Sequence, residues 1–203
     1  MNRREFAKGI ALAGGLMASP ALLRAQGTAL RFAHYGTASD SVSAAATRLA
    51  ELAAEKTGGA LTVEVYGNGE LGSSPTMLEG TRLGTIDMAT TGNPYFTASL
   101  PALNLLDLPF LFQSDAHAFA VLDGEVGQTL MSSMSEAGLQ GIAFWELGFR
   151  NLTNNVRAVV TPEDMAGLKI RTTPNPAHVL AFETLGAQPT PMPFGEVYSA
   201  LQT

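Results

Sequence analysis

The sequence predicts an α/β fold with a largely parallel sheet, and three observations support this. The segments 30–35, 61–66 and 85–91 have the character of strands. Helical segments separate them, which gives the order β-α-β-α-β and favours parallel pairing. Hydrophobic residues make up 46% of the 203 residues and charged residues 15%, a composition that supports a packed core and argues against disorder.

The pattern within each element supports this order. The first helix begins near Asp40, carries apolar residues at helical spacing, and ends at the glycine pair 58–59 with Lys56 in its last turn. The strand LTVEVY at 61–66 alternates cleanly, with its leucine and valines facing inward. A second helix is expected over about 74–83, opened by a serine and a proline.

Further elements are expected in the rest of the chain. The region 94–112 is apolar and interrupted by prolines, so it should pack irregularly. The other expected elements are helices near 116–122 and 126–137, strands within 140–148 and 150–155, a short helix opened by TPED at 161–164, a strand that holds Arg171, and a helix that ends at Gly186. An apolar stripe at helical spacing begins at Phe194 and reaches Thr203 without a stop signal, so we expect a truncated chain.

Residues 1–25 are expected to form a secretory signal rather than part of the fold. They have a basic start, an apolar run over 10–23, and small residues before a plausible cleavage site after Ala25. The run is too short and too rich in glycine for a good membrane span. The motif RREFAK at 3–8 matches the twin-arginine export pattern, with an ordinary signal and a chance arginine pair as the alternative. Either signal takes the mature protein out of the cytoplasm, and the twin-arginine route predicts a periplasmic location.

The charge of the mature chain narrows its possible partners. Of 12 basic and 18 acidic residues, four basic and one acidic lie in residues 1–25, so the mature chain has a net charge of −9. This charge argues against nucleic acid or an anionic membrane as a partner. The sequence contains no cysteine, which excludes disulfides, thiolate metal sites and cysteine nucleophiles. Individual arginines would have to bind any anionic ligand.

The sequence GNGELG at 67–72 matches the pattern G-x-G-x-x-G, and Asp87 follows Gly67 by twenty residues. A dinucleotide fingerprint here would support an alternative function, that of a twin-arginine-exported, dinucleotide-dependent oxidoreductase. Three details favour a glycine-rich turn instead. The preceding strand exposes Thr62 and Glu64, the third glycine precedes the expected helix, and Asp87 lies near the start of its strand.

No arrangement of side chains indicates catalysis or metal binding. The histidines His34, His117 and His178 are not paired at helical spacing, and no nearby acidic cluster completes a ligand set. His34 ends the first strand and could line a cleft. No nucleophile-elbow motif is present, and favourable charge at a helix start explains Glu163-Asp164. We therefore expect no enzyme activity, no metal and no cofactor.

Two arginines differ from the other basic residues in their context. Arg150 and Arg171 each border strand-like apolar sequence, in FWELGFRNL and LKIRTT. An arginine held there offers a planar set of donors that matches a carboxylate bidentately. The alternative is a structural salt bridge to an acidic residue of the chain. Solvent exposure is a sufficient explanation for the other candidates, which are Arg31, Arg48, Lys56, Arg82 and Arg157.

Three motifs in the last third of the chain resemble those of a known family. They are G-x-R-x-x-T-N from Gly148, P-x-D-x-x-G-L-K-x-R from Pro162, and L-G-A-x-P-T-P-M-x-F-x-E-V-Y-x-A-L-Q from Leu185. Together with LRFAH, ELG and LPFLF in the first part, they are similar to the DctP-type solute-binding subunits of tripartite ATP-independent periplasmic (TRAP) transporters. The resemblance implies a clamshell of two α/β lobes, the first over 26–148 and the second over 149–203.

The resemblance also implies the main ligand contacts. In the family the arginine of the L-K-x-R strand binds the carboxylate of the substrate, and that residue here is Arg171. The arginine of G-x-R, here Arg150, is a second polar contact. The aromatic residue of P-M-x-F, here Phe194, lines the binding site.

Residues of the first lobe are expected to tune specificity. They follow the first and third strands and are His34, Tyr35, Gly92 and Asn93. Asn175, just after Arg171, is a weaker candidate for which turn chemistry is the alternative explanation.

The implied function is the capture of a small organic acid and its delivery to the integral membrane subunits of a TRAP transporter. The family pattern continues into a V-D-G-x-E-N segment that this sequence does not contain. The loop 91–93 carries no acid, although some sialic-acid-binding relatives have a glutamate there. Sialic acid is therefore not the expected ligand.

Overall fold

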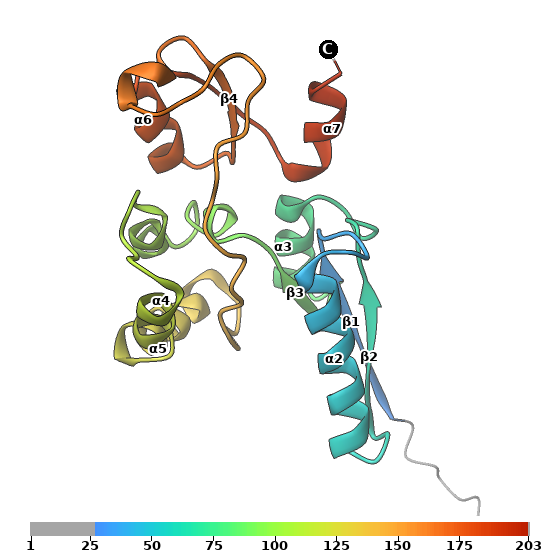
Figure 1. The fold of residues 1–203 in the computed structure, drawn as a ribbon. Coiled ribbons are helices and arrows are strands. Elements are labelled where there is room, and N and C mark those ends of the chain that lie inside the picture. Colours follow the sequence, from blue (N-terminus) through green and yellow to red (C-terminus); the bar gives the residue numbers. More distant parts are fainter. Residues whose placement is uncertain (1–26, 203) are drawn as a thin grey trace, which may run out of the picture.

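The computed structural model of the chain describes residues 27–202, so the signal predicted over 1–25 lies outside the described residues. The described chain forms a first part around a three-stranded sheet and a second part around a two-stranded sheet (Figure 1). The predicted α/β class is confirmed. Within residues 27–202, no helix combines the length and the apolar character needed to cross a bilayer.

Three parallel strands form the first sheet, in the order β2-β1-β3. β1 spans Thr28–His34, β2 spans Leu61–Tyr66 and β3 spans Met88–Thr90. Helix α2 (Ser41–Lys56) connects β1 to β2, and α3 (Ser74–Arg82) connects β2 to β3. The β-α-β-α-β order expected from the sequence is therefore present.

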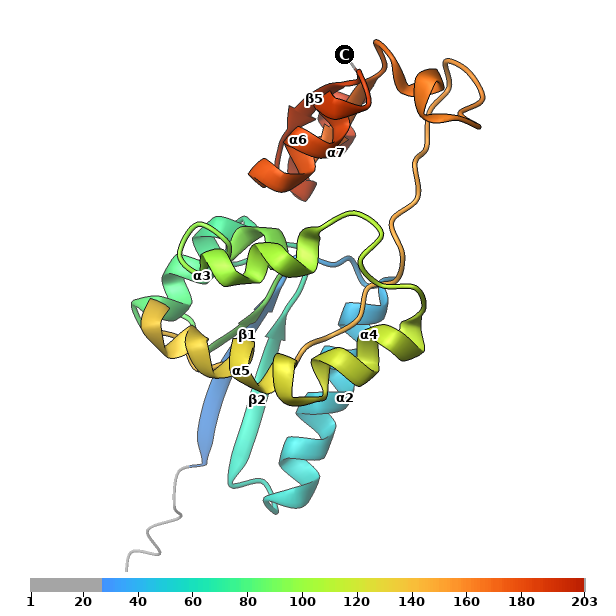
Figure 2. The same ribbon diagram turned by 90° about the vertical axis from the view of Figure 1, so that its left-hand side faces the viewer.

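The central strand β1 becomes more buried toward its carboxyl end. Phe32, Ala33 and His34 are buried, whereas the strand begins exposed. Ala33 packs with Met77 of α3 and with Ile86 in one core cluster. Parallel strands end at the same edge of a sheet, and the second part of the chain lies beyond that edge (Figure 2). This is the edge at which open α/β sheets bind ligands.

Short helical segments follow β3. They are η1 (Asn93–Tyr95), η2 (Pro101–Asp107), α4 (Asp115–Leu122), α5 (Glu125–Ser133) and η3 (Met134–Ala137), where η marks a 3₁₀ helix. Leu100, Leu103, Leu130 and Ala137 form their common core. The region 94–112, for which irregular packing was expected, contains 3₁₀ turns and no strand.

The second part begins after a long connection. Its elements are η4 (Pro162–Met165), β4 (Lys169–Thr172), α6 (Pro176–Thr184), β5 (Gln188–Pro191), η5 (Phe194–Glu196) and α7 (Val197–Ala200). β4 and β5 pair in parallel, with Arg171 opposite Thr190. The core of this part consists of Met165, Leu168, Ile170 and Ala187.

Strand β5 was not expected, because its sequence QPTP contains two prolines. Proline has no N–H group to donate to a neighbouring strand. In β5 the residues that donate toward the β4 side alternate with the prolines. The N–H of Gln188 donates to Leu168 O at 2.7 Å, and the N–H of Met192 donates to Thr172 O at 3.0 Å. Pairing with a single neighbour therefore does not require the missing N–H groups.

The segments 140–148 and 150–155 were expected as strands, and this prediction was wrong, because both lack regular secondary structure. A strand persists only where its backbone groups pair with a neighbour, and neither segment has one among the described residues. They form instead the connection between the two parts (Figure 1). Ile142 and Phe149 in this connection are 71% and 57% exposed.

The close packing of α5 on α4 depends on Gly127. A Cβ atom at this position would lie 1.8 Å from the carbonyl oxygen of Leu122. We expect Gly127→Ala to push the two helices apart and to lower the free energy of unfolding by about 1–3 kcal/mol, the usual cost of overpacking. Urea denaturation followed by circular dichroism measures this difference.

Gly195→Ala is the matched control, because a Cβ atom at Gly195 meets no atom within 4 Å. This variant should unfold at nearly the same urea concentration as the wild type. Equal stability of the two variants would contradict the close approach of α5 to α4.

Candidate functional site

Arg171 is held in place without an acidic partner. It is half-buried in β4, between the buried Ile170 and Thr172. Its Nε and Nη2 atoms donate to the carbonyl oxygen of Met192, at 3.2 and 2.8 Å. None of the acidic residues in 27–202 forms an ion pair with it. The contact with Met192 uses one side of the guanidinium and leaves both N–H groups of Nη1 and one of Nη2 as donors.

Arg150 lies in the connection between the two parts and is exposed. No ion pair within residues 27–202 includes it. It nevertheless acts on its neighbours. Burial is the larger cause that lowers the pKa of Arg171 and of His178, and the charge of Arg150 adds to both shifts. Two guanidinium groups therefore lie within electrostatic range of each other, and a bound anion would relieve their repulsion.

The other arginines of the described chain have internal partners. They form the ion pairs Arg31–Asp87 at 3.0 Å, Arg48–Glu51 at 3.0 Å and Arg82–Glu79 at 3.1 Å. Arg157 donates to the carbonyl oxygens of Asp164 and Ala166. For Arg150 and Arg171, the structural salt bridge considered from the sequence is not formed with any residue in 27–202.

An aromatic contact connects the two parts beside Arg171. Tyr35, which follows β1, meets Phe194 of η5 edge to face, with ring centroids 6.0 Å apart and planes at 72°. Phe194 is 47% exposed and follows Met192, which holds Arg171, by two residues. Burial raises the pKa of Tyr35, so its hydroxyl is neutral at physiological pH. The two rings form an apolar surface next to a cationic one.

Sequence reasoning missed Thr91 and Tyr95, which lie just after β3. The side-chain oxygens of both residues are shielded from solvent and make no hydrogen bond in the described chain. Burial lowers the pKa of Arg171, and the hydroxyl of Tyr95 opposes that shift, so this hydroxyl lies near the guanidinium. Only Gly92 and Asn93 of the loop after β3 were expected to affect ligand specificity. Position after a strand end was the available signal for Thr91 and Tyr95.

Asn93 and Gly92 shape the loop that carries Tyr95. The Asn93 Nδ2 group donates to Leu103 O and to Asp107 Oδ2, both at 2.9 Å. Its amide donors are therefore used within the protein. The carbonyl oxygen of Gly92 accepts from the Tyr95 N–H at 3.1 Å and closes the turn of η1. In this conformation both residues position the loop.

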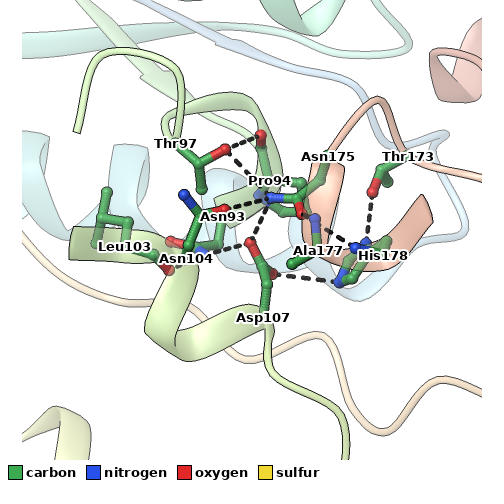
Figure 3. A network of polar contacts seen from close by, with 10 residues as sticks. All are labelled: Asn93, Pro94, Thr97, Leu103, Asn104, Asp107, Thr173, Asn175, Ala177 and His178. Atoms are coloured by element: carbon green, nitrogen blue, oxygen red, sulfur yellow. Dashed lines mark hydrogen bonds and ion pairs between the residues drawn. The ribbon is translucent and has the colours of Figure 1, made fainter. Parts of the chain in front are cut away.

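Asn175 has a structural role in this conformation. It is fully buried and is the N-cap of α6, where its Oδ1 accepts from the backbone N–H groups of Ala177 and His178 at 2.8 and 3.2 Å. Its Nδ2 lies 3.1 Å from oxygen atoms of three first-part residues, Thr97, Asn104 and Asp107 (Figure 3). The amide joins the two parts and has no free donor for a ligand.

Asp107 and His178 complete this buried network. His178 Nε2 lies 3.6 Å from Asp107 Oδ1, and its Nδ1 is 2.7 Å from the hydroxyl oxygen of Thr173. Burial raises the pKa of Asp107 to about 6 and lowers the pKa of His178 to about 4. Both shifts favour the neutral form, which is the expected effect of a site with little water.

His34 is also buried, with 1% of its surface exposed. Its Nδ1 atom makes no hydrogen bond to any residue in 27–202, and burial lowers the pKa of His34, so the ring is neutral at physiological pH. The glycine-rich turn lies over this ring: a Cβ at Gly67 would be 2.9 Å from its Cε1 atom, and the N–H of Gly69 donates to His34 O at 3.1 Å. The third glycine, Gly72, precedes α3. The turn therefore covers the end of β1, which matches its structural interpretation.

Two hollows on the described surface lie apart from this arrangement. One is lined by α3 residues together with Arg31 and Tyr66, and the other by residues 152–159. Neither is lined by Arg150 or Arg171. The candidate site is therefore defined by its side chains: two arginines without acidic partners within residues 27–202, the rings of Tyr35 and Phe194, and the hydroxyl of Tyr95.

Two α/β parts that meet beyond the strand ends, with cationic side chains at their boundary, define a protein of the solute-binding class. A family model confirms this: residues 32–203 match the model DctP, described as bacterial extracellular solute-binding protein, family 7. The chain belongs to that family, and the resemblance noted from its motifs is confirmed.

Individual relatives agree with this assignment. The 2,3-diketo-L-gulonate-binding periplasmic protein YiaO of Escherichia coli is 42% identical over 203 residues, which cover 100% of this chain and 61% of the relative. A TRAP periplasmic solute-binding protein from Polaromonas, bound to D-erythronate, matches with a TM-score of 0.83 and 34% identity over 86% of this chain and 58% of that one. A TRAP protein from Sulfurospirillum deleyianum with bound succinate matches with a TM-score of 0.82 and 34% identity, over 86% of this chain and 56% of that one.

These similarities confirm the two-lobed periplasmic binding-protein fold. The chain spans about six-tenths of the length of the relatives it matches, 61% for YiaO and 58% for the Polaromonas protein.

The raised pKa of Asp107 predicts how its replacement changes the pH dependence of stability. Between about pH 4 and pH 6 the folded protein keeps a proton on Asp107 that the unfolded chain has lost, so this residue lowers stability as pH rises. Asp107→Asn removes this effect while keeping an oxygen that can accept from Asn93 and Asn175. Relative to the wild type, the variant should gain unfolding free energy between pH 4 and pH 7, measured by urea denaturation across that range.

His178 changes the pH dependence of stability in the opposite direction. Between about pH 4 and pH 6.5 the unfolded chain binds a proton at His178 that the folded protein excludes, so this residue raises stability as pH rises. Asp123→Asn, at an exposed position, is the control and should leave the pH profile unchanged. If the unfolding free energy of Asp107→Asn varies with pH as that of the wild type does, Asp107 ionises in the folded protein as it does in the unfolded chain.

Proposed function

We propose that the protein is an extracytoplasmic solute-binding protein that captures a small organic acid by its carboxylate and delivers it to the membrane subunits of a TRAP transporter. The observation that carries this proposal is the lack of an acidic partner for Arg150 and Arg171 within residues 27–202, while other arginines of the same region are paired. The whole chain has a net charge of −6, so acidic residues are plentiful, yet none of those in 27–202 forms an ion pair with either arginine.

Arg171 can bind a carboxylate with the donors that Met192 leaves free. One N–H of Nη1 and one of Nη2 point from the end of the guanidinium and match the two oxygens of a carboxylate. Arg150 adds a second charge, and Phe194 with Tyr35 covers the carbon skeleton of the ligand. His34, Gly92 and Asn93 act from the first lobe by shaping the loops.

Binding is expected to close the two lobes, the first over 26–148 and the second over 149–203. A ligand shifts this equilibrium only if it makes better contacts in the closed form. The Tyr35–Phe194 pair joins a first-lobe residue to a second-lobe residue, so a ligand against it contacts both lobes. Closure also excludes water, which strengthens the attraction between carboxylate and guanidinium.

The cellular part of the proposal rests on the sequence and the family. The motif RREFAK at 3–8 supports export by the twin-arginine route, followed by cleavage after Ala25 and function in the periplasm. The ligands named for relatives, 2,3-diketo-L-gulonate, D-erythronate and succinate, all carry a carboxylate. A carboxylate is thus the shared chemical feature that Arg171 would recognise.

Replacement of Arg171 tests the proposal. Arg171→Ala should weaken the binding of a carboxylate ligand by roughly 2–5 kcal/mol, the usual loss when one partner of a buried charge pair is removed. Arg171→Lys should also bind poorly, because a point charge cannot replace the planar set of donors. Isothermal titration calorimetry with D-erythronate and succinate measures both losses.

Arg48→Ala is the matched control, because Arg48 is an exposed arginine of α2 paired with Glu51. Its variant should keep the affinity of the wild type. Unaltered affinity of Arg171→Ala, in a variant that still folds, would contradict the proposed role.

A further inference from the structure

The hydroxyl of Tyr95 is held in a defined place without an acceptor for its proton among the described residues. Its oxygen is shielded from solvent and makes no hydrogen bond within residues 27–202. The turn that carries it is anchored on both sides: Asn93 Nδ2 donates to Leu103 O at 2.9 Å, and Thr97 Oγ1 donates to Pro94 O at 3.0 Å. A loose loop therefore does not explain the missing partner.

The surroundings of this hydroxyl indicate what kind of partner is missing. Arg171, which lies near it, carries only donors. The tyrosine oxygen can accept from a guanidinium, but the O–H proton of Tyr95 still has no acceptor in the described chain. Apart from that oxygen, the remaining N–H groups of Arg171 have no acceptor among the described residues, because Met192 O occupies the other side of the group. Both residues therefore need an acceptor, and a carboxylate supplies two oxygens.

A shielded hydroxyl without a partner is costly, and phenylalanine would fill the same space without that cost. A hydroxyl at this position is explained if it is paired when ligand is bound. Thr91 also has a shielded oxygen without a partner in the described chain, but no contact described there places it near Arg171.

We infer that the Tyr95 hydroxyl donates a hydrogen bond to the same ligand carboxylate that Arg171 binds. The inference rests on the proposed function and adds a carboxylate contact from the first part of the chain. Since Tyr95 lies in η1 and Arg171 in β4, one carboxylate would be held from both parts at once. The carboxylate end of the ligand, rather than its carbon skeleton, would then connect the two lobes.

Tyr95→Phe separates this role from a structural one. The variant removes only the hydroxyl, so the affinity for D-erythronate and for succinate should fall about ten- to hundredfold, as for the loss of a hydrogen bond to a charged group. Both acids should lose a similar factor, because each presents a carboxylate, whereas only D-erythronate carries hydroxyls. Isothermal titration calorimetry of the wild type and the variant gives the two ratios.

The thermal midpoint without ligand provides the second measurement. Because the O–H proton has no acceptor within residues 27–202, Tyr95→Phe should melt at the wild-type temperature or above it. Tyr66→Phe is the matched control: its hydroxyl donates to Glu64 at 3.0 Å on β2, so its loss should leave both affinities unchanged.

The other outcomes are distinct from one another. Unchanged affinities in Tyr95→Phe, together with lost binding in Arg171→Ala, would overturn the role of Tyr95 and leave the proposed function standing. A loss for D-erythronate alone would assign the hydroxyl to a ligand hydroxyl and overturn the carboxylate assignment. A lower melting temperature of the free variant would mean that the hydroxyl has a structural partner. If the wild type binds neither acid, the proposed function fails and this inference fails with it.

Discussion

The buried amide of Asn175 is the contact on which the arrangement of the two parts depends. Its oxygen caps α6, and its nitrogen lies against oxygens of the first part, including that of Asp107 (Figure 3). Removing the amide would leave the buried N–H groups of Ala177 and His178 without their capping oxygen. The amide therefore sets the place of α6 against the first part. Helix α6 connects β4, which carries Arg171, to β5. The position of Arg171 therefore depends on Asn175, whose buried side chain has no free group for a ligand.

Much of the fold could be predicted from local pattern, and the exceptions share one cause. Clean alternation identified β2, and helical spacing with terminal glycines identified α2. Pairing could not be predicted in the same way. The segment 140–148 has strand-like composition but no neighbour among the described residues, whereas β5 has two prolines and pairs through the N–H groups between them. Composition indicates the strand propensity of a segment, but a strand forms only where a second strand is available to pair with its backbone.

The candidate site was predictable to the extent that it depends on local context. Arg171 could be selected because an arginine at a strand end is unusual in an acidic chain. Turn chemistry was the alternative considered for Asn175, and its role in the structure is the related one of capping α6. Its contacts with residues about seventy positions earlier were not visible, because only the folded chain brings them together. The unpaired hydroxyl of Tyr95 was hidden for the same reason: a missing partner is a property of the whole environment.

The carbonyl of Met192 has a thermodynamic consequence for Arg171. A free arginine side chain loses about 2 kcal/mol of rotamer entropy when it is immobilised. Because two N–H groups of Arg171 are already bonded to Met192 O, much of that loss occurs when the protein folds. Every acid that reaches the guanidinium gains equally from this preorganisation. The hydrogen bonds to Met192 O therefore favour tight binding of acids in general. Discrimination among acids has to arise from the groups around the rest of the ligand.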